Sequence, residues 1–81
     1  MKVPRDLSGH GLASLLQRYG YRITRQTGSH VQLECKHAAS EHHISIPAHE
    51  SLRIGTLNKI LRLVAGFLQK EKDELVRELF G

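Results

Sequence analysis

The sequence predicts one α+β domain in which a three-stranded antiparallel sheet carries helices on one face, in the order α-β-β-β-α with a C-terminal helical tail. Apolar residues recur at helical spacing over residues 8–19 and again over 57–68, and the short segments between them alternate with a period of two. The 81 residues have room for a single core, and 40% of them are hydrophobic, which is typical of a folded domain.

The first helix is predicted over residues 8–19, because apolar residues recur there at i, i+3, i+4 and i+7. Ser8 is the expected N-cap, and Gly20 can adopt the left-handed conformation that ends a helix. Gly9 and Gly11 fall in the first turn, where each should cost roughly 1 kcal/mol relative to alanine. The apolar stripe consists of Leu12, Leu15, Leu16 and Tyr19.

Two strands are predicted next, at residues 21–26 and 30–36, because apolar and polar residues alternate within them. Thr27-Gly28-Ser29 joins the two strands. Gly28 permits the positive φ that a tight hairpin turn requires. The strands should therefore pair as an antiparallel hairpin.

The alternation along this hairpin predicts which side chains face the core. His30 should stand at the start of the second strand and face away from the core. Arg22 and Arg25 are expected to point to opposite faces of the first strand, because a regular strand alternates. The residues expected to face inward on the second strand are Val31, Leu33 and Cys35.

A third strand is predicted after a polar loop over about residues 37–42. Ile44 and Ile46 alternate there with polar residues, and Pro47, which lacks an N–H donor, should end the strand. This strand completes a three-stranded antiparallel sheet.

A second helix should follow, because Gly55-Thr56 offers a turn and an N-cap directly before an apolar stripe. Gly66 allows two interpretations, which the sequence leaves open. Either it ends this helix, with a third helix over residues 70–79, or it is tolerated within a longer helix. The stripe consists of Leu57, Ile60, Leu61, Val64 and Leu68.

Positive charge is concentrated in residues 1–65, which carry nine Lys or Arg against four Asp or Glu, whereas residues 66–81 carry three against four. A basic body favours a polyanion such as nucleic acid, although many soluble proteins have a similar balance. We therefore treat residues 1–65 as the main domain and residues 66–81 as a helical extension packed on the same domain.

Cys35 is the one cysteine, which excludes an internal disulfide and fits a reducing compartment. The N-terminal residues lack the apolar run of a secretory signal, and no apolar stretch approaches the roughly 20 residues needed to span a bilayer. We expect a cytoplasmic protein without a membrane partner.

The segment from Arg25 to His30 carries the residues best suited to catalysis. Cleavage of RNA without a metal needs a base for the 2′-hydroxyl proton, an acid for the leaving oxygen and positive charge around the phosphorus. His30 is the candidate general base or acid, because it should be exposed and imidazole exchanges protons near neutral pH. Arg25 is a candidate phosphate ligand, as are Arg22 and Lys36. The alternative is that all four are solvated surface residues.

The start of the second helix is another candidate phosphate site. Unpaired backbone N–H groups at Gly55-Thr56 can bind a phosphate oxygen, and Lys59 lies one turn further along. The simpler interpretation is that Thr56 only caps the helix.

Four histidines suggest a metal site, but their spacing does not suit zinc. We predict no metal and no cofactor. These histidines are His37, His42, His43 and His49.

Five motifs occur in a specific order along the chain. They are Lys2-Val3-Pro4 with Ser8-Gly9, Gly20-Tyr21, Arg25-Gln26-x-Gly28-Ser29-His30, Ile46-Pro47-x-His49, and Gly55-Thr56-Leu57-x-x-Ile60-Leu61-Arg62. On these motifs the chain resembles the HicA (YcfA-like) toxins of bacterial type II toxin-antitoxin systems over nearly all of residues 1–65.

The resemblance implies a fold like the double-stranded-RNA-binding domain, with residues 1–65 as the toxin domain. It implies a ribonuclease that cleaves mRNA and halts translation until a HicB-type antitoxin covers it. His30 falls on the family's catalytic histidine, and Gly28 and Ser29 fall on the turn that shapes the approach of substrate. We expect no binding of DNA by the chain alone.

The leading hypothesis is therefore a metal-independent endoribonuclease toxin with His30 as general acid/base. The expected substrate-binding residues are Arg25, Gly28, Ser29, Thr56 and Lys59. A noncatalytic double-stranded-RNA-binding module is the alternative, since the same fold and charge would serve it. A protein-interaction domain is a third possibility, which the apolar and acidic tail alone supports.

Overall fold

The computed structural model describes residues 3–81, so Lys2 of the Lys2-Val3-Pro4 motif lies outside the described residues. The predicted α+β class is confirmed: helices pack with one antiparallel sheet of strand order β1-β2-β3, consistent with the fold of a double-stranded-RNA-binding domain. The elements are α1 (Gly9–Leu16), η1 (Gln17–Tyr19), β1 (Arg22–Thr27), β2 (His30–His37), β3 (Ser40–Pro47), α2 (Ile54–Leu68) and α3 (Lys72–Phe80).

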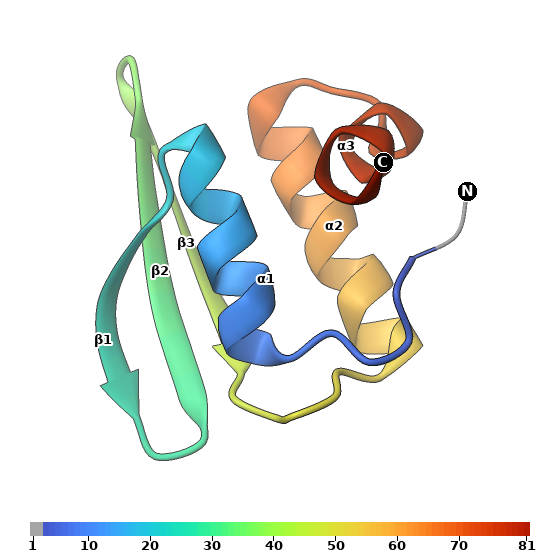
Figure 1. Cartoon of the computed structure of the whole chain (residues 1–81). Coiled ribbons are helices and arrows are strands. Elements are labelled where there is room, and N and C mark those ends of the chain that lie inside the picture. The colour runs from blue at the N-terminus through green and yellow to red at the C-terminus, as the bar shows by residue number, and fades with distance from the viewer. Residues whose placement is uncertain (1–2) are drawn as a thin grey trace.

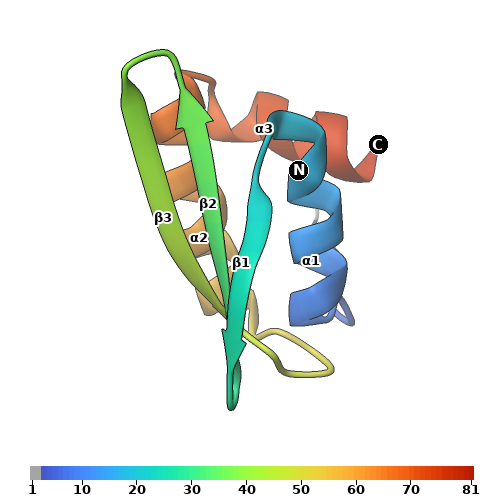
Figure 2. The same ribbon diagram turned by 90° about the vertical axis from the view of Figure 1, so that its left-hand side faces the viewer.

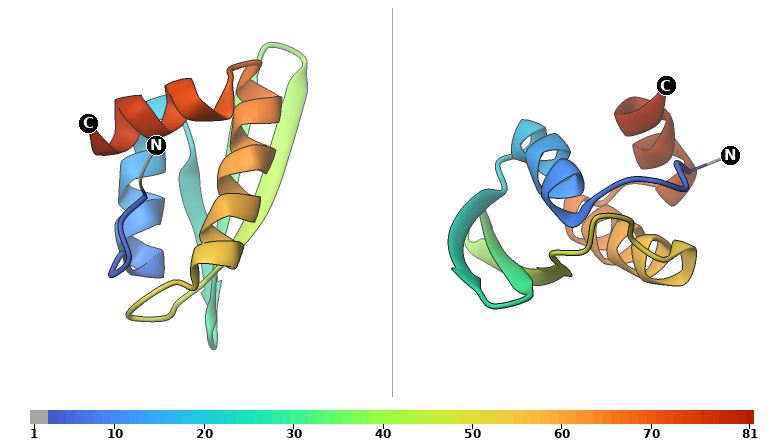
Figure 3. Two further views of the ribbon diagram at one scale, coloured as in Figure 1. Left: turned by 90° about the vertical axis from the view of Figure 1, so that its right-hand side faces the viewer. Right: turned by 60° about the horizontal axis from the view of Figure 1, so that its bottom comes forward.

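The helices lie on one side of the sheet. Figure 1 shows α1 and α2 against the same face, and the left view of Figure 3 shows α3 lying across the ends of both helices. In Figure 2, which looks onto the other face, no helix of the described chain lies in front of the strands. We call the uncovered side the outer face.

The inner face of the sheet and the helices enclose one core. The predicted inward residues of β2 are each at most 1% exposed, whereas every residue of β1 is exposed, as befits an edge strand. The buried hydrophobic residues are Leu12, Ala13, Leu16, Tyr21, Val31, Leu33, Cys35, Ile44, Ile46, Leu52, Leu57, Ile60, Leu61, Val64, Ala65, Leu75, Val76 and Leu79.

The caps predicted for the first helix are present. The Ser8 side chain accepts a hydrogen bond from the Gly11 N–H over 2.9 Å, and Gly20 adopts a φ of 94° after the 3₁₀ turn η1. Gly9 has a packing role that helix propensity does not reveal. A Cβ at Gly9 would overlap the carbonyl of Pro47, so this glycine allows α1 to approach the end of β3.

The strand pairing contradicts the predicted polar loop over residues 37–42. β2 and β3 are joined by the two-residue turn Ala38-Ala39, and β3 already begins at Ser40, which pairs with His37. Ala38 takes a φ of 56°, a conformation that normally favours Gly or Asn. The sequence therefore lacked the usual signal for a tight turn here.

The register between β1 and β2 shifts just before Arg25, where Thr24 is an extra residue on β1. Arg22 lies opposite Glu34, and Arg25 lies opposite Gln32. Both partners are outward-facing residues of β2, and cross-strand partners share a face. The prediction that Arg22 and Arg25 point to opposite faces was wrong, because the bulge resets the alternation.

The second helix begins earlier than predicted. Its N-cap is Arg53, which makes no side-chain capping hydrogen bond, so the prediction of Thr56 as N-cap was wrong. Gly66 lies inside α2, which ends two residues later where Gln69 adopts a left-handed φ of 57°. Both interpretations of Gly66 were therefore partly right: the glycine is tolerated, and a separate helix, α3, follows.

The C-terminal segment is held against η1 by a polar contact as well as by its buried side. The Glu78 carboxylate accepts hydrogen bonds from the Tyr19 hydroxyl over 2.6 Å and from Lys70 Nζ over 3.0 Å. These two bonds lower the pKa of Glu78. Partial burial and the bond to Glu78 raise the pKa of Tyr19 to about 12. Within residues 3–81, no helix has the length and apolar character needed to cross a membrane.

Candidate active site

Backbone contacts on both sides hold His30 in position. It is the first residue of β2, where it pairs with Thr27 on β1 and with Pro47 on β3. The turn before it is fixed as well, since the carbonyl of Ser29 accepts a hydrogen bond from the Ala48 N–H over 2.7 Å. The imidazole therefore stands on a rigid base while the residue remains exposed.

The turn residues behave as predicted at the backbone. Gly28 has a φ of 54°, and a Cβ built there would meet no other atom within 4 Å. Ser29 Oγ lies 3.3 Å from His30 Nδ1. Among residues 3–81, no hydrogen-bond partner of His30 Nε2 is found, so this nitrogen is free to meet a substrate.

His30 lines a pocket of about 360 Å³ together with residues of β3 and α2. The pocket brings His30 together with Thr56 and Lys59, which the sequence suggested as phosphate ligands on separate grounds. The α2 residues of the pocket occupy positions i, i+3, i+4 and i+7, so they form one face of that helix. The complete lining is His30, Ser45, Pro47, Thr56, Lys59, Ile60 and Leu63.

Arg25 does not line this pocket, and neither do Gly28 and Ser29. Arg25 lies on the outer face, opposite Gln32 and therefore diagonal to His30. Lys36 is further along β2 and is engaged by acidic neighbours, with Nζ 3.5 Å from Glu34 Oε1. Arg25 thus lies near the candidate site and Lys36 lies away from it, and neither residue lines the pocket.

Sequence reasoning missed Ser45 as a site residue. Gln32 Nε2 donates a hydrogen bond to Ser45 Oγ over 3.3 Å, so the Ser45 hydroxyl keeps its own proton for a further acceptor. The alternation of Ile44 and Ile46 did place Ser45 on the outer face, but its approach to His30 depends on the register of β2 with β3.

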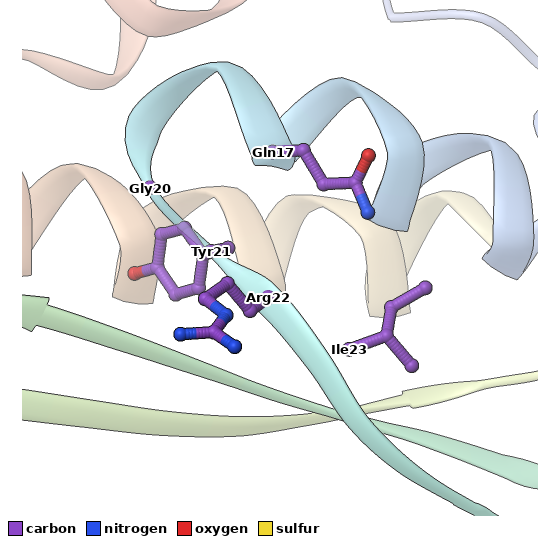
Figure 4. Close-up of a pocket in the computed structure, with 5 residues that line it drawn as sticks. All are labelled: Gln17, Gly20, Tyr21, Arg22 and Ile23. Atoms are coloured by element: carbon purple, nitrogen blue, oxygen red, sulfur yellow. The ribbon is translucent and has the colours of Figure 1, made fainter.

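A larger hollow of about 420 Å³ lies elsewhere, where η1 leads into β1 (Figure 4). It is lined by Gln17, Gly20, Tyr21, Arg22 and Ile23. Arg22 is a candidate phosphate ligand, but this lining contains no candidate general base. The smaller pocket beside His30 is therefore the better candidate for catalysis.

Other histidines have structural contacts, among them His42 and His43. His42 faces inward, where Nδ1 lies 2.6 Å from the Tyr21 hydroxyl and the ring stacks on Phe67 with centroids 4.8 Å apart. Partial burial, and next the neighbouring His43, lower the pKa of His42. His43 Nε2 lies 3.3 Å from Glu41 Oε2. Within the described part of the chain, no cluster of three or more His, Cys, Asp or Glu is arranged to hold a metal ion.

The fold and the pocket define a small α+β domain of the double-stranded-RNA-binding type with an exposed histidine in a pocket that Lys59 of α2 also lines. The sequence model described as HicA toxin of bacterial toxin-antitoxin matches residues 10–64, so the chain belongs to the HicA toxin family. The matched range covers His30, Thr56, Lys59 and Leu63 and ends before α3. No curated protein and no solved structure matches the chain.

Membership of this family confirms the resemblance drawn from the motifs. It also implies an antitoxin partner, because a toxin of this kind functions within a toxin-antitoxin system.

Proposed function

We propose that the chain is a metal-independent endoribonuclease that cleaves mRNA, with His30 as general acid/base. One observation carries the proposal: His30, Lys59 and Thr56 line the same pocket, although the first lies at the start of β2 and the others lie on α2. A proton-transfer group and a cation around one cavity supply two of the elements that cleavage at a 2′-hydroxyl requires, a base and positive charge at the phosphorus.

In the proposed reaction, Nε2 of His30 takes the proton of the 2′-hydroxyl as the 2′ oxygen attacks the adjacent phosphorus. The bond to the 5′ oxygen breaks, and this oxygen leaves with a proton from solvent. The products are a 2′,3′-cyclic phosphate and a 5′-hydroxyl end. Because one histidine acts as the base, positive charge and hydrogen-bond donors must stabilise the crowded phosphorus.

Several groups are suited to that stabilisation. Lys59 supplies the charge within the pocket, and Ser45 supplies an O–H donor that Gln32 orients. The first N–H of α2 with an intrahelical partner is that of Leu57, so the amides before it remain available to a phosphate oxygen near Thr56. Arg25, from the outer face, would hold the RNA backbone outside the pocket.

We further propose that a HicB-type antitoxin neutralises the toxin by covering this pocket, and that the toxin acts on mRNA in the cytoplasm. Residues 1–65 would form the toxin domain and residues 66–81 an extension packed on it. The burial of Leu75, Val76 and Leu79 in the common core supports the packing of this extension on the toxin domain.

The decisive experiment incubates the purified chain with a defined RNA in EDTA, alongside His30→Ala and His43→Ala. His43 is the matched control, because it is also an exposed histidine of the sheet. We expect wild type and His43→Ala to release 2′,3′-cyclic phosphate ends, and His30→Ala to be slower by at least about 100-fold. RNA that is bound but not cleaved by wild type would instead support the noncatalytic module, and normal cleavage by His30→Ala would refute the role of His30.

A further inference from the structure

We propose that the pocket beside His30 is a subsite for one nucleotide. In this subsite an aliphatic wall made by Pro47, Ile60 and Leu63 contacts the base, and the 3′ phosphate of the same nucleotide lies next to the His30 imidazole. This inference deepens the proposed function, on which it rests, by naming the part of the substrate that the pocket binds.

The lining of the pocket has two kinds of surface. His30, Lys59, Ser45 and Thr56 supply polar or charged groups, whereas the remaining lining residues, the three of the aliphatic wall, are apolar. A nucleotide has the same division, with an anionic phosphate at one end and the flat apolar face of a base at the other. The charge and the wall therefore complement opposite ends of one ligand.

Leu63 is the member of the wall with most surface to offer. It is 49% exposed, while Ile60 is 5% exposed and supports the wall from the core side. A single exposed leucine is ordinary on a protein surface. Leu63 differs in that its exposed side chain faces a concave site that also contains a candidate catalytic residue.

The spacing along α2 suits a nucleotide. Leu63 follows Lys59 by four residues, which is roughly 6 Å along a helix axis. A nucleotide whose phosphate is held at Lys59 would thus have its base within reach of Leu63. The pocket volume of about 360 Å³ lies near the lower end of the range for ligand sites, roughly 300–1,000 Å³. A cavity of this size suits one nucleotide.

The character of the wall predicts how bases are distinguished. Aliphatic side chains contact the face of a base and carry no donor or acceptor for its edge. The subsite should therefore favour purines over pyrimidines modestly, through contact area, rather than read one base.

The test uses mononucleotides, so that it does not depend on cleavage. Adenosine 3′-monophosphate, uridine 3′-monophosphate and inorganic phosphate are titrated into the full chain and followed by NMR chemical shifts. Leu63→Ala is compared with Ile54→Ala, because Ile54 is a similarly exposed apolar residue of α2, at 41%, that does not line the pocket. Thermal unfolding of each variant checks that the fold is retained.

We expect wild type to bind adenosine 3′-monophosphate more tightly than uridine 3′-monophosphate, and both more tightly than phosphate. Leu63→Ala should weaken adenosine 3′-monophosphate roughly three- to tenfold, in proportion to the apolar area lost, and leave phosphate unchanged. Ile54→Ala should bind all three probes as wild type does.

The inference is overturned if wild type binds phosphate as tightly as the nucleotides. It is also overturned if Leu63→Ala binds the nucleotides normally, even where the same change weakens a complex with the antitoxin. Leu63-dependent nucleotide binding by a chain that cleaves no RNA would support the subsite and refute the proposed function. RNA cleavage without Leu63-dependent nucleotide binding would support the proposed function and refute the subsite.

Discussion

The hydroxyl of Tyr21 and Nδ1 of His42 lie 2.6 Å apart, at the end of the sheet where β3 packs against α2. Tyr21 is 1% exposed, and burial raises the pKa of its phenol. The imidazole of His42 also stacks on Phe67 of α2. This contact joins the sheet to the helix that lines the candidate active site, and it contains an imidazole whose pKa is lowered by burial.

The stability of the protein should decrease in mild acid because of His42. Burial, followed by the charge of His43, lowers the pKa of His42 from its ordinary value of 6.5. As the pH falls, the unfolded chain therefore binds a proton at His42 before the folded chain does. The stabilisation that comes from neutral His42 is complete above pH 6.5 and is lost as the pH falls through the folded pKa. Urea unfolding at about pH 7.5 and about pH 5 measures the difference. His42→Gln should show a smaller loss than wild type, with His49→Gln as the control, and equal losses in all three proteins would contradict the assignment.

Gly9→Ala should destabilise the fold by about 1–3 kcal/mol, because the added methyl group would overlap the Pro47 carbonyl. Gly66→Ala is the matched control. A Cβ at Gly66 meets nothing within 4 Å, so this change should stabilise α2 by about 1 kcal/mol. Denaturant unfolding measures both changes, and two effects of the same sign would show that α1 does not approach β3 as closely as described.

Arg22 and Arg25 should both contribute to RNA binding, because the bulge at Thr24 puts them on the same outer face. In a His30→Ala background, which prevents the proposed cleavage, each change to Gln should make the fall of the log binding constant with log salt less steep by about 0.7 for single-stranded RNA. Arg77→Gln, on α3, should leave the slope unchanged. A changed slope for only one of the two hairpin arginines would argue against a shared binding face.

The C-terminal helix should unfold together with the rest of the domain. Leu75 is fully buried in the common core, so Leu75→Ala should cost about 2–5 kcal/mol while the transition stays cooperative. Glu71→Ala, at the exposed N-cap of α3 whose side chain makes no capping hydrogen bond, should change stability by no more than about 0.5 kcal/mol. A small effect of Leu75→Ala, or a separate early transition, would mean that residues 66–81 are not part of the same cooperative unit.

Much of the fold could be predicted from local patterns. The apolar stripes of α1 and α2, the Ser8 cap, the glycine turn before His30 and the inward face of β2 each depend on a few neighbouring residues. Helical and strand periodicity arise from backbone geometry within one element, so the sequence is sufficient to recognise them. The exposed setting of His30 followed from the same reasoning.

Nonlocal packing determined the remaining features. The bulge at Thr24 and the alanine turn at Ala38 depend on how strands pair, and sequence alternation contains no information about an extra residue in one strand. The meeting of His30 with Lys59 and Leu63 depends on where α2 lies beside β3. Each strand and helix could be anticipated singly, because local backbone preferences act along the chain, whereas the pocket arises from contacts between residues far apart in sequence.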